Sequence, residues 1–175
     1  MNFTGRWAAM VAQLNRLAES QLEMFVFGTD RTRTAKIRVG LWEIQGCRCF
    51  YCGGRIMEPV RGQVDHFVPW SRYPDDTLDN FVVADNGCNG FKSNSLAAAD
   101  HLTRWTRRFM EGSSEYAQLA DLAKGAAWDR QAGRNLNVAR AIYPRLPDDA
   151  RLWLRGKESV PPDSTMIGTA LNVSS

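Results

Sequence analysis

The chain has 175 residues, enough for one substantial hydrophobic core but short for two independent domains. A net charge of +3 excludes a strongly basic or acidic protein, although eighteen of the twenty-two basic residues are Arg. No stretch approaches the roughly 18 apolar residues of a membrane span, and Arg6 and Gln13 interrupt any signal-like start. We therefore expect a cytoplasmic protein with no membrane partner.

The first forty residues contain two segments with clear patterns. Apolar residues recur three and four positions apart over residues 4–24, which predicts an amphipathic helix. Residues 31–38 carry four basic side chains at alternate or near-alternate positions. This basic segment either begins a solvated helix or contacts a phosphate backbone, and the sequence favours neither reading.

Most of the candidate metal-binding and catalytic residues lie within residues 49–95. This stretch opens with Cys49-x-x-Cys52, a spacing that can hold one half of a zinc site, and Cys88 lies near its end. Because this motif stands beside a cluster of polar residues, the four cysteines indicate metal ligands and not a secreted disulfide framework.

Two short runs between the cysteines predict a β-hairpin with a long loop. Residues 62–65 are β-prone and end in Asp65-His66, and residues 81–84 form an apolar run suited to a buried strand. Pro and Asp residues over 69–79 break regular structure between them. The residues after Cys88 lead into a helix, so Asn89 is expected near a helix start.

This pattern resembles the HNH endonuclease family, in its bacterial branch with a Cys-x-x-Cys zinc knuckle. The matching residues are Asp65, His66, Asn80 and Asn89, where Asn80 follows His66 by fourteen positions and Asn89 follows Asn80 by nine. The resemblance covers about a quarter of the chain. It implies an α+β fold: a ββα-metal (HNH) core with a zinc knuckle, wrapped by N- and C-terminal α-helices.

The resemblance also implies a catalytic role for each matching residue. Histidine suits a general base near neutral pH, so His66 would activate water for phosphodiester hydrolysis. Asp65 and Asn89 offer hard oxygen ligands and would hold one catalytic Mg²⁺ or Mn²⁺ ion. Asn80 would fix the orientation of the loop that carries His66. Lys92, one helical turn after Asn89, is a predicted phosphate contact.

The expected structural Zn²⁺ site departs from the commonest family pattern. The second knuckle is Asp85-x-x-Cys88 where many members have two sulfur or imidazole ligands. Zinc held by Cys49, Cys52, Asp85 and Cys88 is chemically allowed, with Asp85 or a water completing the site. Two alternatives stay open: Cys47 replaces Asp85, or zinc is absent and hydrophobic packing holds the hairpin.

Downstream of this segment the sequence predicts several helices. Residues 96–110 place apolar side chains on one face and Arg104, Arg107 and Arg108 on another, either as nucleic-acid contacts or as a solvated face. Residues 116–124 and 128–143 predict two more helices, and residues 148–154 a last short one. We expect one nuclease domain over residues 1–156, with a core at 41–110 and helical flanks at 4–40 and 111–156, and a loose tail at 157–175.

These features predict a metal-dependent HNH endonuclease that hydrolyses DNA, in restriction or phage defence by resemblance only. RNA stays open as a substrate, as do a homodimer and a separate targeting subunit as partners. The alternative function is a non-catalytic zinc-knuckle module that binds nucleic acid or protein. A Cys-x-x-Cys redox protein is a third reading, and the flanking hairpin pattern argues against it.

Overall fold

The computed structural model describes residues 31–172, so the helix predicted over residues 4–24 lies outside the described part of the chain. The chain divides into two compact units at residue 36, and Lys36–Ser175 forms the unit that holds the predicted site. Helix α3 (Arg31–Ile44) crosses this division. The basic segment is thus the start of a helix, and its contact with phosphate remains a prediction.

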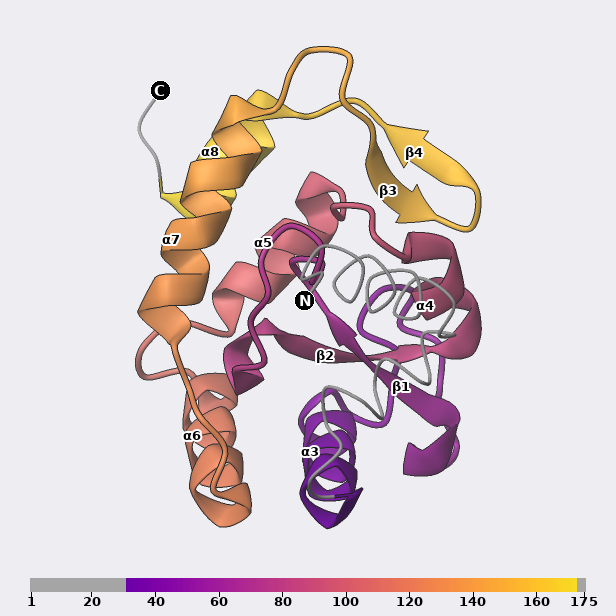
Figure 1. Cartoon of the computed structure of the whole chain (residues 1–175), viewed down its shortest axis with the longest axis vertical. Helices are drawn as coiled ribbons and strands as arrows, with labels where there is room; N and C mark the ends of the chain where they lie inside the picture. Colours follow the sequence, from indigo (N-terminus) through magenta and orange to yellow (C-terminus); the bar gives the residue numbers. More distant parts are fainter. Residues whose placement is uncertain (1–30, 173–175) are drawn as a thin grey trace, which may run out of the picture. The chain divides into compact units, whose positions relative to one another are not determined.

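Helices and two separate two-stranded sheets make up the rest of the described chain, which confirms the expected α+β class (Figure 1). After α3 they are β1 (Gly62–His66), β2 (Phe81–Asp85), α4 (Asn86–Lys92), α5 (Ala99–Arg107), α6 (Ser114–Ala126), α7 (Ala132–Ile142), β3 (Leu152–Arg155), β4 (Glu158–Val160) and α8 (Ser164–Leu171). Three 3-10 helices complete the list: η1 (Pro59–Arg61), η2 (Leu78–Asn80) and η3 (Tyr143–Arg145).

Strands β1 and β2 form the predicted hairpin, and α4 follows β2 directly. The strands are antiparallel, with His66 opposite Phe81 and Gly62 opposite Asp85. A Cβ atom at Gly62 would lie 2.5 Å from Val83 Cγ1, so only glycine fits at the start of β1. Residues 81–84 are buried, as their apolar run predicts for a strand covered on both faces.

The segment before α5 differs from the predicted helix over residues 96–110. Leu96–Ala98 is not helical; Ala97 forms a parallel bridge with Trp153. The Ala98 amide donates to the Trp153 carbonyl at 2.8 Å, and the Trp153 amide donates to the Leu96 carbonyl at 2.8 Å. These long-range hydrogen bonds override the helix propensity of the alanines, so α5 begins at Ala99.

The C-terminal predictions were wrong in two places. Residues 148–154 contain strand β3, paired with β4, where a helix was predicted. The expected loose tail from residue 157 instead contains β4 and α8. Helix α8 buries Ile167 and Leu171 and packs against α5 and α7, because its apolar residues recur at helical spacing (Figure 1).

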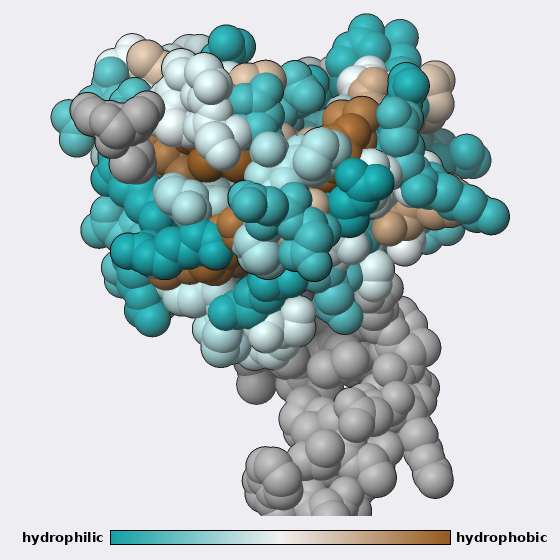
Figure 2. All heavy atoms as spheres, turned by 90° about the horizontal axis from the view of Figure 1, so that it is seen from above, coloured by the Kyte–Doolittle hydropathy of each residue, from teal (hydrophilic) through white to brown (hydrophobic). Residues whose placement is uncertain are grey.

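Apolar side chains at the surface are few and separate. On the face in Figure 2, hydrophobic residues come to the surface in small areas between hydrophilic ones. The exposed large hydrophobic side chains among the described residues are Val39, Met57, Val60, Trp70, Phe91 and Met110. Within residues 31–172 no helix has both the length and the apolar character that crossing a bilayer requires.

Candidate active site and metal centre

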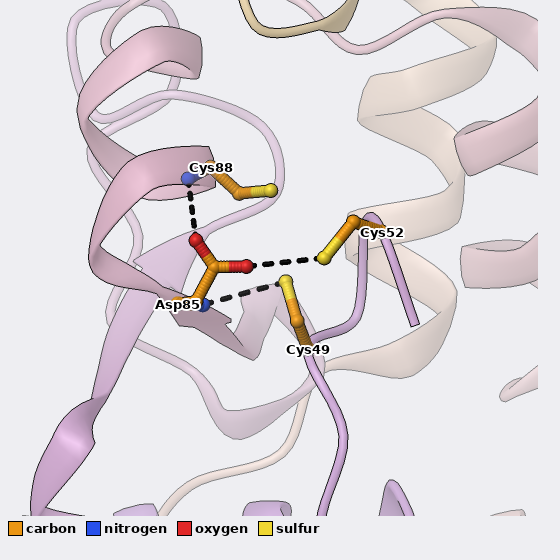
Figure 3. A group of neighbouring side chains, drawn as sticks. All are labelled: Cys49, Cys52, Asp85 and Cys88. Carbon is orange, nitrogen blue, oxygen red and sulfur yellow. Dashed lines mark hydrogen bonds between the residues drawn. The ribbon is translucent and has the colours of Figure 1, made fainter. Parts of the chain in front are cut away.

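The four predicted zinc ligands lie together between the knuckle turn and the start of α4. One ligand atom each from Cys49, Cys52, Asp85 and Cys88 lies within 4.8 Å of the others, and the side chains point toward one another (Figure 3). The first two come from a tight turn in which Gly53 has φ +71°, and the last two from the β2–α4 junction. Three sulfur atoms and one carboxylate oxygen form a donor set that suits Zn²⁺.

Hydrogen bonds also link these four groups to one another. Cys52 Sγ donates to Asp85 Oδ2 at 3.1 Å, and Asp85 Oδ1 accepts from the Cys88 amide at 2.8 Å as the N-cap of α4. Burial alone would raise the pKa of Asp85, but these bonds and those from the Cys49 and Cys88 thiols lower it to about 2. The predicted set with Asp85 is therefore assembled, and Cys47 is outside the group.

For two of the thiols the pKa is raised, and burial is the largest cause. It raises the pKa of Cys49 to about 11, and it raises the pKa of Cys88 as well, with the nearby Cys49 and Asp85 adding to the shift. The thiols therefore hold their protons at neutral pH when no ion is bound. A bound cation would replace these protons, because thiolates are the form that coordinates metals.

His66 ends β1 and is only partly buried, with a side-chain exposure of 18%. Its Nε2 atom lies 2.9 Å from Asp76 Oδ1. The ring packs edge-on against Phe81 and Trp70, with centroid distances of 5.0 and 5.5 Å. The partial exposure leaves the ring within reach of solvent, as a general base requires.

Asp65, one residue earlier, is held from two sides. Tyr51 donates its hydroxyl to Asp65 Oδ2 at 2.5 Å, and Lys92 Nζ lies 3.0 Å from the same oxygen. Burial, with the Asp65 charge as the next cause, raises the pKa of Tyr51 well above its ordinary value. Asp65 Oδ1 is less engaged, since Lys92 Nζ is 3.4 Å away from it.

Lys92 does not reach solvent, so the predicted phosphate contact is wrong for this structure. Its side chain has 0% exposure, and besides Asp65 it binds the His66 carbonyl oxygen at 2.9 Å. Asn89 lies three residues earlier on α4, at a partly exposed position. Residues three apart share a helix face, so Asn89 lies on the side of α4 that turns toward β1.

Asn80 is fully buried and holds the loop after His66. Its Oδ1 accepts from the Val68 amide at 2.9 Å, and its Nδ2 donates to the Val68 carbonyl at 3.0 Å. Both polar atoms of the Asn80 side-chain amide thus bind the backbone of one loop residue, Val68. This is the kind of contact that the family resemblance implies for Asn80.

The three arginines of α5 do not form a common solvent-facing surface. Arg108 is 2% exposed and donates to the Phe81 carbonyl at 2.8 Å, so its predicted nucleic-acid contact is wrong. Burial lowers the pKa of Arg108 to about 10. Arg104 donates to the carbonyls of Phe50 and Tyr51 in the knuckle. Arg107 is exposed, and its contact with nucleic acid remains a prediction.

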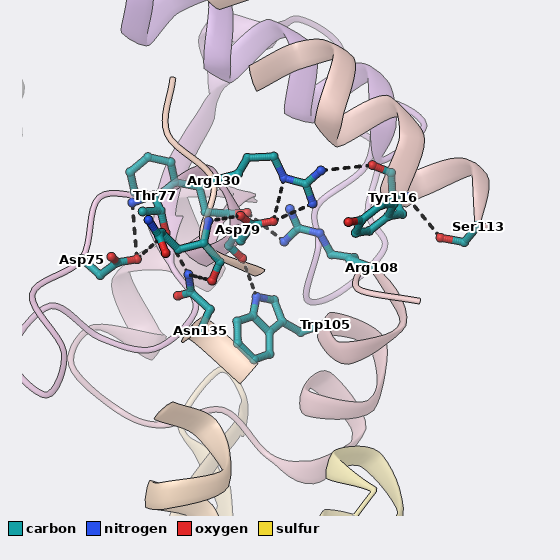
Figure 4. Close-up of polar contacts among 11 residues, drawn as sticks. Asp75, Thr77, Asp79, Trp105, Arg108, Ser113, Tyr116, Arg130 and Asn135 are labelled. Atoms are coloured by element: carbon teal, nitrogen blue, oxygen red, sulfur yellow. Dashed lines mark hydrogen bonds and ion pairs between the residues drawn. The ribbon is translucent and has the colours of Figure 1, made fainter. Parts of the chain in front are cut away.

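A buried polar network behind the hairpin loop was missed from the sequence (Figure 4). Asp79 has 0% exposure and accepts from Arg130 Nε at 3.0 Å, Arg130 Nη2 at 2.8 Å and the Gln131 amide at 2.7 Å. Asn135 donates to Thr77 Oγ1 at 2.8 Å. No local pattern pairs residues more than fifty positions apart, so the sequence offers no way to find these partners.

Comparison with protein families agrees with this geometry. A family model described as HNH endonuclease matches residues 49–98, which include the knuckle, the hairpin and α4. The crystal structure of the Type II-C Cas9 enzyme from Actinomyces naeslundii is 24% identical with a TM-score of 0.35. That match covers 78% of this chain but only 13% of the Cas9 chain, and no curated protein matches the sequence. The segment over residues 49–98 is therefore similar to the HNH endonuclease family.

Proposed function

We propose that the chain is a metal-dependent endonuclease that hydrolyses DNA phosphodiester bonds with His66 as the general base. The observation that carries the proposal is the position of His66, which ends the first strand of a ββα hairpin inside the matched segment and remains partly exposed. Asp65, Asn80 and Asn89 accompany it at the family's spacing.

In the proposed reaction His66 removes a proton from water as the water oxygen attacks the phosphorus atom. The bond between phosphorus and the 3′-oxygen breaks, and the leaving oxygen takes up a proton from solvent. Asn80 keeps the loop after His66 in place through both of its hydrogen bonds to Val68. Asp65 and Asn89 would hold a Mg²⁺ or Mn²⁺ ion, which supplies charge stabilisation at the phosphoryl and leaving oxygens. Asp65 Oδ1 fits this role, because Tyr51 and Lys92 bind chiefly to Oδ2.

The second metal of the proposal is a structural Zn²⁺ at Cys49, Cys52, Asp85 and Cys88. Its ligands join the knuckle turn to the β2–α4 junction, and α4 carries Asn89. A zinc ion there would hold α4 against the strands and so fix the distance between the two parts of the catalytic site. Restriction or phage defence as the biological setting rests on family resemblance alone.

One observation favours a second candidate, a non-catalytic zinc-knuckle module that binds nucleic acid or protein. The Asp65 carboxylate is already paired with Lys92 at 3.0 Å and with the Tyr51 hydroxyl. In such a module this carboxylate would serve the fold and not a catalytic ion. The two candidates differ in one measurable property, the cleavage of a phosphodiester bond.

The test is a cleavage assay with supercoiled plasmid, single-stranded DNA and RNA, in Mg²⁺, Mn²⁺ or EDTA. We expect DNA cleavage that needs the divalent ion, and a rate about 10²–10⁴-fold lower for His66→Ala because general-base catalysis is lost. Asp148→Ala, which removes an exposed carboxylate, is the matched control and should cut like the native chain. Equal rates from the native chain and His66→Ala would refute the assignment of the base, and cleavage of RNA alone would change the substrate.

A further inference from the structure

Asp76 lies in the loop between β1 and β2 and contacts the ring of His66. The distance between Asp76 Oδ1 and His66 Nε2 is 2.9 Å, and the two side chains are 32% and 18% exposed. A carboxylate oxygen at hydrogen-bond distance from one ring nitrogen fixes the direction in which the imidazole points.

The aromatic neighbours of His66 restrict the plane of its ring. Phe81 and Trp70 meet the ring at interplanar angles of 76° and 63°. These apolar contacts limit the tilt of the ring, and the Asp76 carboxylate adds a polar contact at Nε2.

The backbone of Asp76 is in turn held by the connection between α6 and α7, residues 127–131. Trp128 Nε1 donates to the Asp76 carbonyl at 2.7 Å, and the Leu78 amide donates to the Asp129 carbonyl at 2.9 Å. The buried pair of Asp79 and Arg130, seen in Figure 4, fixes the end of the same loop. The Asp76 carboxylate therefore belongs to a loop that is held at three residues, Asp76, Leu78 and Asp79.

We propose that Asp76 is a positioning residue for His66: its carboxylate binds Nε2 and holds the ring in the orientation in which it takes a proton from water. The connection over residues 127–131 keeps Asp76 at the required place. The proposal rests on the proposed nuclease function for what the ring does, whereas the contact between Asp76 and His66 does not depend on that function.

The test compares Asp76→Ala and Asp76→Asn with Asp148→Ala in the full chain. The sequence has two histidines, so ¹⁵N NMR of the rings is readily assigned with His66→Gln. We expect a hydrogen-bonded Nε2–H signal for His66 in the native chain, its loss in Asp76→Ala, and partial retention in Asp76→Asn, which keeps an acceptor oxygen. We also expect kcat on DNA to fall about 10–100-fold in Asp76→Ala with KM unchanged.

A second comparison separates positioning from a general structural role. If Asp76 acts through His66, then Asp76→Ala added to His66→Ala should lower the residual rate no further, because residues that act as one unit are not additive. A further drop in that background, with loss of thermal stability, would assign Asp76 to the fold and overturn the proposal.

Failure of the proposal and failure of the proposed function give different results. If Asp76→Ala keeps both the His66 ring signal and the native kcat, the positioning role falls and the nuclease assignment stands. If the native chain cuts nothing while the ring signal disappears in Asp76→Ala, the nuclease assignment falls and the orienting contact stands.

Discussion

The ammonium group of Lys92 lies where solvent does not reach, between the Asp65 carboxylate and the His66 carbonyl. Its position also brings it 5.8 Å from the centre of the Tyr51 ring. Removing one member of a buried ion pair leaves the other charge uncompensated, which is more costly than the pair itself is stabilising. Lys92 thus links α4 to the last two residues of β1.

We expect Lys92→Met to lower the free energy of unfolding by about 3–5 kcal/mol, because Asp65, whose side chain is only 11% exposed, would lose the cation that compensates its charge. Urea unfolding followed by circular dichroism measures the change. Lys157→Met is the matched control, since Lys157 is exposed and its loss should change stability by less than about 0.5 kcal/mol. Unchanged stability in Lys92→Met would show that Asp65 does not need this partner.

The motif residues could be predicted from the sequence, whereas the burial and the contacts of their neighbours could not. Asp65, His66, Asn80 and Asn89 stand out because their types and spacing are local properties of the chain. Burial depends on elements that are distant in the sequence, so the sequence alone predicted Lys92 and Arg108 to be surface residues. Asp76 was treated as a turn former for the same reason, although its carboxylate meets His66.

At the scale of elements, the four candidate zinc ligands connect the knuckle turn to α4. Cys49 and Cys52 belong to the turn, whereas Cys88 and its helix cap Asp85 belong to the β2–α4 junction. Arg104 of α5 adds a second connection through the carbonyl of Phe50. The position of α4 therefore depends on the ligands and on the neighbouring helix together.

We expect the affinity of this group for Zn²⁺ to rise with pH. Burial raises the pKa of Cys49 to about 11 and also raises that of Cys88, so both thiols are protonated without metal and must release protons when zinc binds. Each proton released makes the apparent affinity about tenfold weaker per unit fall in pH. Competition with a chromophoric chelator at pH 6, 7 and 8 measures the slope.

Two variants check the origin of that pH dependence. Cys88→Ser removes a ligand and should reduce both the affinity and the slope. Cys47→Ser is the matched control, because Cys47 is outside the group and should change neither. A native affinity that is constant from pH 6 to 8 would contradict thiolate coordination.

The hairpin and the knuckle could be predicted from sequence because both depend on short-range patterns: apolar runs, turn residues and cysteine spacing. Strands β3 and β4 could not, since β3 starts within a segment that reads as a helix and becomes a strand by pairing with β4 and with Ala97. Helix α8 was missed because the Ser, Pro and Gly residues around it suggested a loose tail.

At the scale of the whole molecule, the segment that matches the HNH endonuclease model is completed by residues outside it. Trp128 and Arg130 bind the loop at Asp76 and Asp79, and Trp153 pairs with the backbone at Leu96 and Ala98. The predicted core at residues 41–110 lacks all three partners. It would leave the buried Asp79 carboxylate without its cation.

We therefore expect a fragment of residues 41–110 to lack a cooperative unfolding transition, because its loop and the segment before α5 lose their long-range hydrogen bonds. Thermal and urea unfolding by circular dichroism test this, with zinc present. A fragment of residues 36–172, which keeps these contacts, is the control and should unfold in one transition. Equal cooperativity in the two fragments would show that residues 41–110 fold alone.

The separation of 51 positions between Asp79 and Arg130 also matters while the protein is being made. The ribosome releases the histidine and its loop well before the arginine that anchors them. Synthesis proceeds at about 5–20 residues per second, so the nascent chain spends several seconds with this loop unanchored. The order of synthesis thus delays a fully ordered candidate site until most of the polypeptide has emerged, so the new protein passes through an interval in which this site is incomplete.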